Sequence, residues 1–178
     1  MARVATIPLI TDDAASPELR SEFAIMKQIM GDVPPLARVV ANLPPLVHPF
    51  MAFAGSLIAE NKLPMVLKEL AVLRVSEING CNYCKGWHAP LAEQVGIVGG
   101  RRTALTEATP TPGLFDEKEL LVLQLADEMT RDVQAQAETV ARARQLLGDA
   151  ATLELMMTIG LYNLINRVAR SSGLPLDG

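Results

Sequence analysis

The apolar residues of this 178-residue chain recur at three- and four-residue steps almost throughout, the spacing of amphipathic helices. The segment 64–80 shows this most clearly before Asn79-Gly80 ends it. Its recurring apolar residues are Val66, Leu67, Leu70, Leu73 and Ile78. No alternating pattern typical of a β-strand has useful length, and no internal repeat is convincing. The pattern therefore predicts an all-α fold, with residues 1–178 forming a single domain.

Proline, glycine and capping residues divide the pattern into separate helices. Ser16 is expected to cap a first helix that has Pro17 at its first position and ends near Met30. Proline pairs at 34–35 and 44–45 enclose a short helix and begin a longer one that runs to about Glu60. Further helices are expected over about 82–95, 116–132, 134–147 and 150–171. Between them, residues 98–115 predict a short helix and then a mobile Pro/Thr/Gly loop.

Composition and charge narrow the class of protein. Apolar residues make up 49% of the chain and charged residues 20%, as in globular proteins. The mean hydropathy of +0.23 is high for a soluble monomer, so apolar surface is expected either in a large core or between subunits. The net charge of −4 offers nothing to attract nucleic acid or an anionic membrane.

The most apolar segments do not predict a signal peptide or a membrane span. Pro8 interrupts the N-terminal apolar residues before they reach the length of a signal-peptide core. The most apolar window, residues 43–60, contains three prolines and His48 near its start. We therefore expect a cytoplasmic protein, and in the cytoplasm a pair of cysteines is rarely a structural disulfide.

Both cysteines of the chain and one of its two histidines lie in the stretch EINGCNYCKGWHAP, residues 77–90. On a helix, Cys81, Cys84 and His88 share a stripe about 60° wide, so all three side chains face the same neighbour. The free N–H groups of the first turn favour a thiolate there, and His88 lies one turn from Cys84, where it can hold or relay its proton. These features favour a redox-active thiol pair.

Other chemistries remain open for the same residues. A closed zinc site needs a fourth ligand, which His48 or an acid would have to supply. A thioredoxin fold needs βαβ units around the motif, whereas helices are predicted on both sides of it. Two inert buried thiols are a third alternative. A general base is also needed, and the preceding helix offers Glu69 and Glu77, between which the spacing does not choose.

The residues KELAVLRVSEINGCNYCKGWH, 68–88, resemble the core motif of the AhpD-like alkylhydroperoxidase, or carboxymuconolactone decarboxylase, superfamily. In that motif a glutamate precedes C-x-x-C by eleven residues, and a histidine follows four residues after the second cysteine. Glu69, Cys81, Cys84 and His88 match each spacing. The resemblance favours Glu69 over Glu77. It also implies an AhpD-like helical bundle with the C-x-x-C motif at the N-terminus of a central helix.

The resemblance further implies a thiol-dependent peroxidase that uses neither cofactor nor metal. In this interpretation Cys84 attacks the hydroperoxide, Cys81 resolves the sulfenic acid as a disulfide, and Glu69 with His88 relays protons. A thiol, such as a dihydrolipoyl protein, supplies the electrons, and the chain assembles as a homotrimer or hexamer. One departure is Tyr83, because the best-known hydroperoxidases carry a second histidine between the cysteines. A tyrosine is a poor base near neutrality, so the relay is expected to be shorter.

Two other functions stay open. Members of the decarboxylase branch typically lack the cysteine pair, so both thiols speak against a lactone substrate. A thiol redox sensor or a helical interaction protein without catalysis is the alternative from a different class.

Three features outside the motif carry weaker expectations. Four polar residues recur along the last helix, where they are expected to order a subunit interface, line a pocket or face solvent. They are Asn163, Asn166, Arg167 and Arg170. His48 is expected in the core or at a contact, and Trp87 in the core or in the wall of a site.

Overall fold

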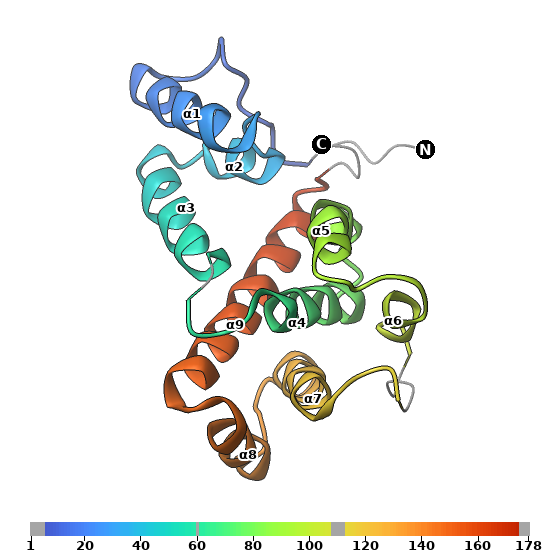
Figure 1. The fold of residues 1–178 in the computed structure, drawn as a ribbon. Helices are drawn as coiled ribbons and strands as arrows, with labels where there is room; N and C mark the ends of the chain where they lie inside the picture. The colour runs from blue at the N-terminus through green and yellow to red at the C-terminus, as the bar shows by residue number, and fades with distance from the viewer. Residues whose placement is uncertain (1–5, 60, 108–112, 175–178) are drawn as a thin grey trace.

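The computed structural model describes residues 6–59, 61–107 and 113–174, and within these ranges every regular element is an α-helix (Figure 1). In chain order the helices are α1 (Pro17–Met30), α2 (Pro35–Val40), α3 (Pro44–Ile58), α4 (Met65–Ile78), α5 (Asn82–Gln94), α6 (Gly99–Ala104), α7 (Glu117–Arg131), α8 (Ala137–Leu147) and α9 (Asp149–Ser171). The all-α prediction is confirmed, and the expected boundaries agree within a few residues. Glu60 and most of the predicted mobile loop, 108–112, lie outside the described residues.

The helix ends follow the capping chemistry that the sequence indicated. The Ser16 side chain accepts a hydrogen bond from the Leu19 N–H at the start of α1. At the start of α7, Asp116 and Glu119 form a reciprocal capping box that satisfies two free backbone N–H groups. Of the helices in the described ranges, none is long and apolar enough to cross a membrane.

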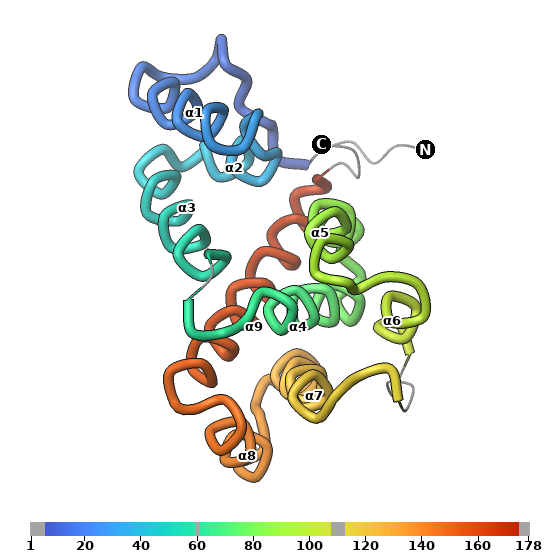
Figure 2. The backbone as a smooth tube through the Cα atoms, viewed as in Figure 1, coloured from blue at the N-terminus to red at the C-terminus, as the bar shows by residue number. Residues whose placement is uncertain are grey.

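Helix α4 lies at the centre of the main core, where it packs against α5, α7 and α9 (Figure 2). Every residue from 67 to 76 is buried, so this helix has no solvent-facing side. It nevertheless carries three charged residues in that buried stretch, Lys68, Glu69 and Arg74. Each needs a partner, because an unpaired charge in the interior is costly.

Two of these charges form structural ion pairs. Arg74 makes a two-pronged pair with Asp127 of α7, in which its Nη2 lies 2.7 Å from Oδ2, and it also donates to the Leu105 carbonyl at 2.7 Å. Lys68 pairs with Glu154 of α9 and donates to the Leu57 carbonyl at 2.8 Å. These contacts fix α4 relative to α7, α9 and the end of α3.

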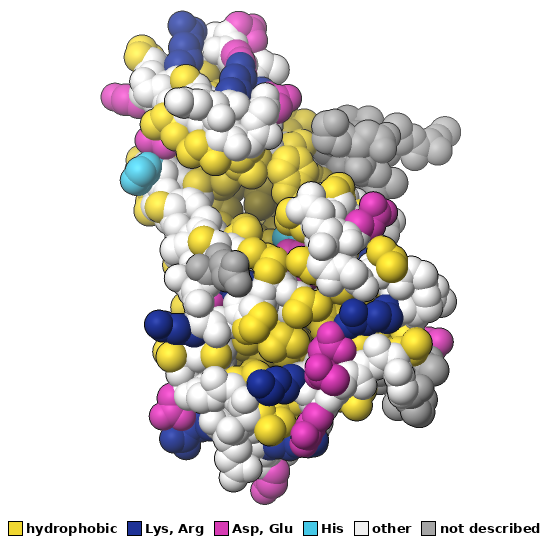
Figure 3. Space-filling view, viewed as in Figure 1, with side chains coloured by type: hydrophobic (Ala, Val, Ile, Leu, Met, Phe, Trp, Pro, Cys, Tyr) yellow, Lys and Arg dark blue, Asp and Glu magenta, His cyan; other side chains and the backbone are white. Residues whose placement is uncertain are grey.

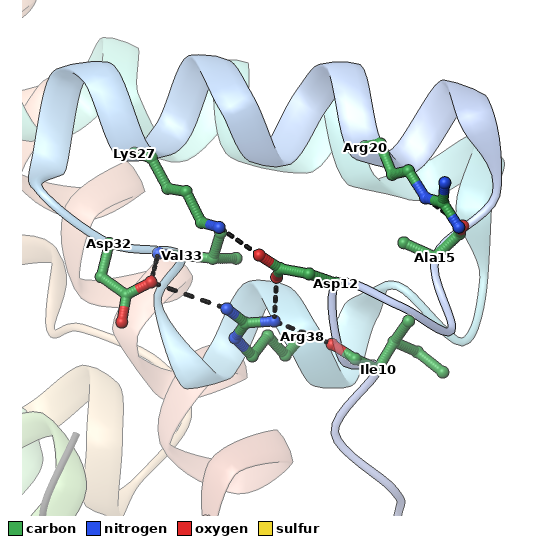
Figure 4. Close-up of polar contacts among 8 residues, drawn as sticks. All are labelled: Ile10, Asp12, Ala15, Arg20, Lys27, Asp32, Val33 and Arg38. Carbon is green, nitrogen blue, oxygen red and sulfur yellow. Dashed lines mark hydrogen bonds and ion pairs between the residues drawn. The ribbon is translucent and has the colours of Figure 1, made fainter.

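Helices α1, α2 and the start of α3 enclose a second, smaller hydrophobic cluster. Its buried members are Ala15, Leu19, Phe23, Met26, Val33, Ala37, Ala41 and Val47. Figure 4 shows how the preceding segment is tied across it: Arg38 of α2 donates to Asp12 at 2.9 Å and to the Ile10 carbonyl at 3.1 Å, and Asp12 also pairs with Lys27 of α1. These contacts hold α1 against α2.

We predict that Lys68→Met lowers the free energy of unfolding by about 3 kcal/mol, because it leaves the Glu154 carboxylate buried without its cation. Urea unfolding followed by circular dichroism measures this change. The matched control is Arg142→Met, which removes an ion pair with Glu117 that is exposed on both sides. That control should cost less than about 1 kcal/mol. Equal losses in the two variants would contradict the structural role of the buried pair.

Candidate active site

The turn between α4 and α5 places the two cysteines in contact. Gly80 adopts a positive φ of 63°, which lets the chain reverse directly after α4. Cys81 is then the N-cap of α5, and its sulfur accepts a hydrogen bond from the Cys84 N–H at 3.4 Å. The two sulfur atoms lie 2.7 Å apart, and both residues are almost fully buried. The prediction that the C-x-x-C motif begins a helix is confirmed.

The two thiols differ in ionisation although they are neighbours. The hydrogen bond from the Cys84 thiol lowers the pKa of Cys81 to about 7, aided by the backbone N–H of Cys84 and by the charges of Arg170 and Lys85, while burial opposes the shift. The pKa of Cys84 is raised, first by sharing its proton with Cys81 and then by burial. The pair therefore holds one negative charge near neutrality, and that charge rests on Cys81.

Behind the thiols, Glu69, His88 and Tyr162 form a buried chain of hydrogen bonds. Nδ1 of His88 lies 2.9 Å from Oε2 of Glu69, and its Nε2 lies 2.6 Å from the Tyr162 hydroxyl. Burial raises the pKa of Tyr162 well above its usual value, and the nearby Glu69 and Cys84 add to the shift. The phenol thus keeps its proton and donates it to His88 Nε2, while His88 Nδ1–H donates to Glu69.

This arrangement agrees in part with the sequence prediction. Glu69 and His88 meet as the motif suggested. Both ring nitrogens of His88 are occupied by Glu69 and Tyr162, so its contact with the thiol side of the site runs through Tyr162 rather than directly to Cys84. Sequence reasoning missed Tyr162. The available signal was its position four residues before Asn166, which places both on one face of α9.

Cys84, but not Cys81, lines an apolar cavity of about 70 Å³ beside this chain. Its wall comes from five helices, namely from Met30, Pro34, Leu36, Phe50, Met51, Ala54, Ile58, Tyr83, Cys84, Trp87, His88, Tyr162 and Ile165. Figure 3 shows hydrophobic side chains around a hollow between the α1–α2 end of the molecule and the helices below it. Substrate can therefore meet Cys84 and Tyr162 in a largely apolar space.

The two aromatic residues of α5 form part of this wall. The Tyr83 hydroxyl accepts a hydrogen bond from the Leu36 N–H at 3.3 Å, and burial raises the pKa of Tyr83 to about 12. Tyr83 therefore links the motif to α2 and is not a base. Trp87 stacks on Tyr83 with ring centroids 6.2 Å apart and is 39% exposed, which places it in the wall rather than in the core.

The polar residues of α9 hold the other side of the thiol turn. Asn166 is fully buried, and its Nδ2 donates to the Cys84 sulfur at 3.1 Å. Asn79 donates to the side-chain oxygens of both Asn163 and Asn166, at 3.0 and 3.2 Å. Arg170 donates to the Asn79 carbonyl, and Arg167 to Asn163. The four residues also differ in exposure, since Arg167 and Arg170 face an open polar pocket.

Two sequence candidates lie away from the site. Glu77 pairs with Lys85 at 2.9 Å and does not join His88. His48 is exposed beside Glu22, with Nδ1 3.3 Å from its carboxylate, so its expected place in the core is wrong. The apolar neighbours of His48 suggested burial, but the rotation of α3 turns its ring outward. Within the described ranges, no three His, Cys, Asp or Glu side chains are arranged to hold a metal ion.

Comparisons with known proteins agree with this geometry. Residues 44–111 match the family described as the Carboxymuconolactone decarboxylase family. A search of curated proteins gave no match.

Solved structures show where the same fold occurs. An uncharacterized peroxidase-related protein from Silicibacter sp. TM1040 is 23% identical, with a TM-score of 0.77 over 96% of this chain and 90% of its own. An uncharacterized peroxidase-related protein from Ralstonia eutropha JMP134, described as an alkylhydroperoxidase AhpD core, is 18% identical, with a TM-score of 0.78 over 98% and 93%. The debrominase Bmp8, solved as a variant with 2,3,4-tribromopyrrole, is 22% identical, with a TM-score of 0.74 over 95% and 91%. At these identities the likeness establishes the fold.

We predict that the native protein loses its first thiol proton with a midpoint near pH 7, below the ordinary value of about 8.5 for cysteine. Alkylation by iodoacetamide should therefore slow as the pH falls through 7. A lowered pKa also adds stability above the unfolded-chain value, and this stability is lost as the pH falls through 7. Thiolate absorbance and alkylation rates measure the midpoint.

The Cys84→Ser variant provides the control for this titration. It removes the S–H donor that is the main cause of the shift, so the midpoint of Cys81 should rise toward the ordinary value. An unchanged midpoint in that variant would show that the shift has another origin.

Proposed function

Residues 44–111 place this chain in the AhpD-like, or carboxymuconolactone decarboxylase, superfamily, and from this premise we propose that it is a thiol-dependent peroxidase that reduces organic hydroperoxides. The observation that carries the proposal is the position of the Cys84 sulfur. It lies in contact with Cys81 on one side and faces an apolar cavity on the other. An enzyme that oxidises one thiol and resolves it with a second needs this arrangement.

In the first step, the charge of the pair moves to the sulfur that faces the substrate. The proton of Cys84 passes to Cys81 across their 2.7 Å contact, which leaves a Cys84 thiolate. This thiolate attacks the terminal oxygen of the hydroperoxide. A sulfur–oxygen bond forms and the O–O bond breaks, so Cys84 becomes a sulfenic acid and an alkoxide leaves. Cys84 has been oxidised and the hydroperoxide reduced.

The leaving alkoxide takes a proton from Tyr162, whose hydroxyl lines the same cavity. His88 and Glu69 support this transfer, because the imidazole hydrogen-bonded to both groups can return a proton to the phenol from solvent. The arrangement parallels a catalytic triad in which a carboxylate orients the histidine and the histidine serves a hydroxyl. The product at this stage is an alcohol.

In the second step, Cys81 attacks the Cys84 sulfenic acid to form the disulfide. The hydroxide that leaves Cys84 accepts the proton of Cys81, so water is released. The lowered pKa of Cys81 suits this role, because a thiolate is the species that attacks. An external dithiol, such as a dihydrolipoyl group, then reduces the disulfide by thiol exchange and becomes oxidised itself. The protein requires no flavin or nicotinamide in this scheme.

The cavity indicates the class of hydroperoxide. Its lining is largely aliphatic, aromatic and methionine side chains, and its volume is close to that of two water molecules. We infer a small organic hydroperoxide whose apolar group lies against α3 and α9. Because the scheme requires reduced thiols, we also propose that the protein works in the cytoplasm.

Reductive debromination is a second candidate, favoured by the aromatic wall of the cavity and by the fold shared with the debrominase Bmp8. A thiolate can attack an electrophilic bromine as it attacks oxygen, with the released carbanion protonated by Tyr162 and the sulfenyl bromide resolved by Cys81. Bromide and the disulfide are then the products beside the debrominated ring. The measured substrate decides between the two candidates.

We propose that the chain assembles as a homotrimer or hexamer through an exposed apolar stripe on α9. Its members lie within about 80° of one another around the helix, with Gly160 between them. They are Leu153, Met157, Leu164 and Val168. A helix that presents such a face to solvent gains stability when a second copy covers it.

Peroxide consumption with a dithiol reductant is the primary test, and the two cysteines should fail in different ways. Cys84→Ser should abolish turnover and leave no sulfenic acid for dimedone to trap. Cys81→Ser should also lose turnover, but dimedone should label Cys84 after one equivalent of hydroperoxide, because the sulfenic acid is no longer resolved. Label on Cys81 in the Cys84→Ser protein, without label on Cys84 in the other variant, would reverse the two roles.

The same assay separates the remaining functions. Oxidation of one dithiol per chain without further turnover indicates a redox sensor and contradicts catalysis. Bromide release from a brominated pyrrole, in the absence of hydroperoxide reduction, supports the debrominase candidate instead.

The assembly has its own test. Sedimentation at micromolar concentration should show a trimer or hexamer, and Leu164→Glu should shift it toward monomer by placing a charge in the apolar contact. Leu120→Glu on the exposed side of α7 is the matched control and should leave the assembly unchanged. A wild-type protein that sediments only as a monomer refutes the assembly.

A further inference from the structure

The side chain of Asn166 is buried against the reacting sulfur and has neighbours at both ends of its amide. Its exposed fraction is 0%, and Nδ2 lies 3.1 Å from the Cys84 sulfur and 3.4 Å from the Ser76 hydroxyl. At the other end, its Oδ1 accepts a hydrogen bond from Asn79 at 3.2 Å. An amide donates only through its nitrogen and accepts only through its oxygen, so the Asn79 contact points the N–H groups at Cys84.

The Asn79 amide is itself held from the outside. It donates to Asn163 as well as to Asn166, and its carbonyl accepts from Arg170. Asn79 is two residues before Cys81, so the same contacts fix the turn on which the thiols stand. The donor aimed at Cys84 is therefore part of a supported network rather than a freely rotating side chain.

We propose that Asn166 is a catalytic residue that stabilises the Cys84 thiolate and so allows the single charge of the thiol pair to move from Cys81 to Cys84. The inference rests on the proposed function, in which Cys84 attacks. A permanent donor is needed on Cys84 because the resting charge lies on Cys81, and Cys84 otherwise gives up its proton only at high pH.

The other groups around Cys84 do not supply this stabilisation. Burial and the neighbouring Cys81 raise the pKa of Cys84, whereas the hydrogen bond from Asn166 lowers it. Tyr162 and Tyr83 keep their protons because burial raises the pKa of each, and Glu69 brings a negative charge to the same side. Lys85 and Arg170 are positive, and both act on Cys81. The neutral amide of Asn166 is thus the donor placed on the attacking sulfur.

The test measures the ionisation of Cys84 without requiring peroxidase activity. In a Cys81→Ser background, the pH dependence of iodoacetamide alkylation reports the pKa of the single thiol. Asn166→Asp keeps an oxygen for Asn79 but turns a carboxylate oxygen toward the sulfur. Alkylation near pH 8 should then slow by about tenfold, the effect of one charge-assisted hydrogen bond.

Asn163→Asp is the matched control, because Asn163 lies on the same helix and binds the same Asn79 but does not contact the sulfur. It should change the rate by less than about twofold. If Asn166→Asp does not fold, as judged by circular dichroism, Asn79→Ala replaces it. That variant frees the oxygen end of the Asn166 amide and should slow alkylation about threefold.

The outcomes separate this proposal from the function on which it rests. A folded Asn166→Asp protein whose Cys84 titrates as before refutes the role of Asn166, and so does an equal slowing by Asn163→Asp. For Asn79→Ala, an unchanged rate refutes the role. These results are independent of whether hydroperoxide is a substrate. In the two-cysteine protein, Asn166→Asp should lower kcat/KM for hydroperoxide while leaving reduction of the preformed disulfide unchanged.

Discussion

The burial of charge on α4 is the constraint on which the rest of the structure depends. A helix with no solvent-facing side carries Lys68, Glu69 and Arg74, and each is paired with a different element. The pairs made by Lys68 and Arg74 use α9 and α7, and they fix the position of α4 in the bundle. Glu69 is held in the same way by His88 of α5. Since a buried charge without a partner is costly, these three pairs define how the helices pack.

The same physics gives the site its chemistry. The Glu69–His88 pair continues to Tyr162, which reaches the apolar cavity, whereas the other two pairs end in carbonyls and carboxylates. The thiols repeat this logic at shorter range. Two sulfurs that are buried and in contact cannot both hold a charge, so their proton is shared and small changes in hydrogen bonding decide which sulfur is reactive. Structural and reactive groups here differ in what lies at the end of the chain of contacts.

Local features of the sequence were predictable because they depend on neighbours along the chain. Ser16, Asp116 and Gly80 mark helix ends through capping and a positive φ, and the motif spacing identified the thiol pair. Tyr162 could not be found this way, since it meets His88 across 74 positions and sits in an apolar stretch that reads as ordinary core. The same limit left Glu69 and Glu77 undecided by spacing. Which acid meets the imidazole depends on how α4 rotates against α5, a property of packing.

The groups of the proposed reaction all lie on α4, α5 and α9, whereas Met30, Leu36, Phe50 and their neighbours on α1, α2 and α3 form the opposite wall of the cavity. The smaller cluster around Phe23 gives that wall a core of its own. Substitutions on α1–α3 can therefore alter the shape offered to a substrate without disturbing the thiol pair or its proton path. A bundle divided in this way can acquire new substrates in evolution by changing one part and preserving the other.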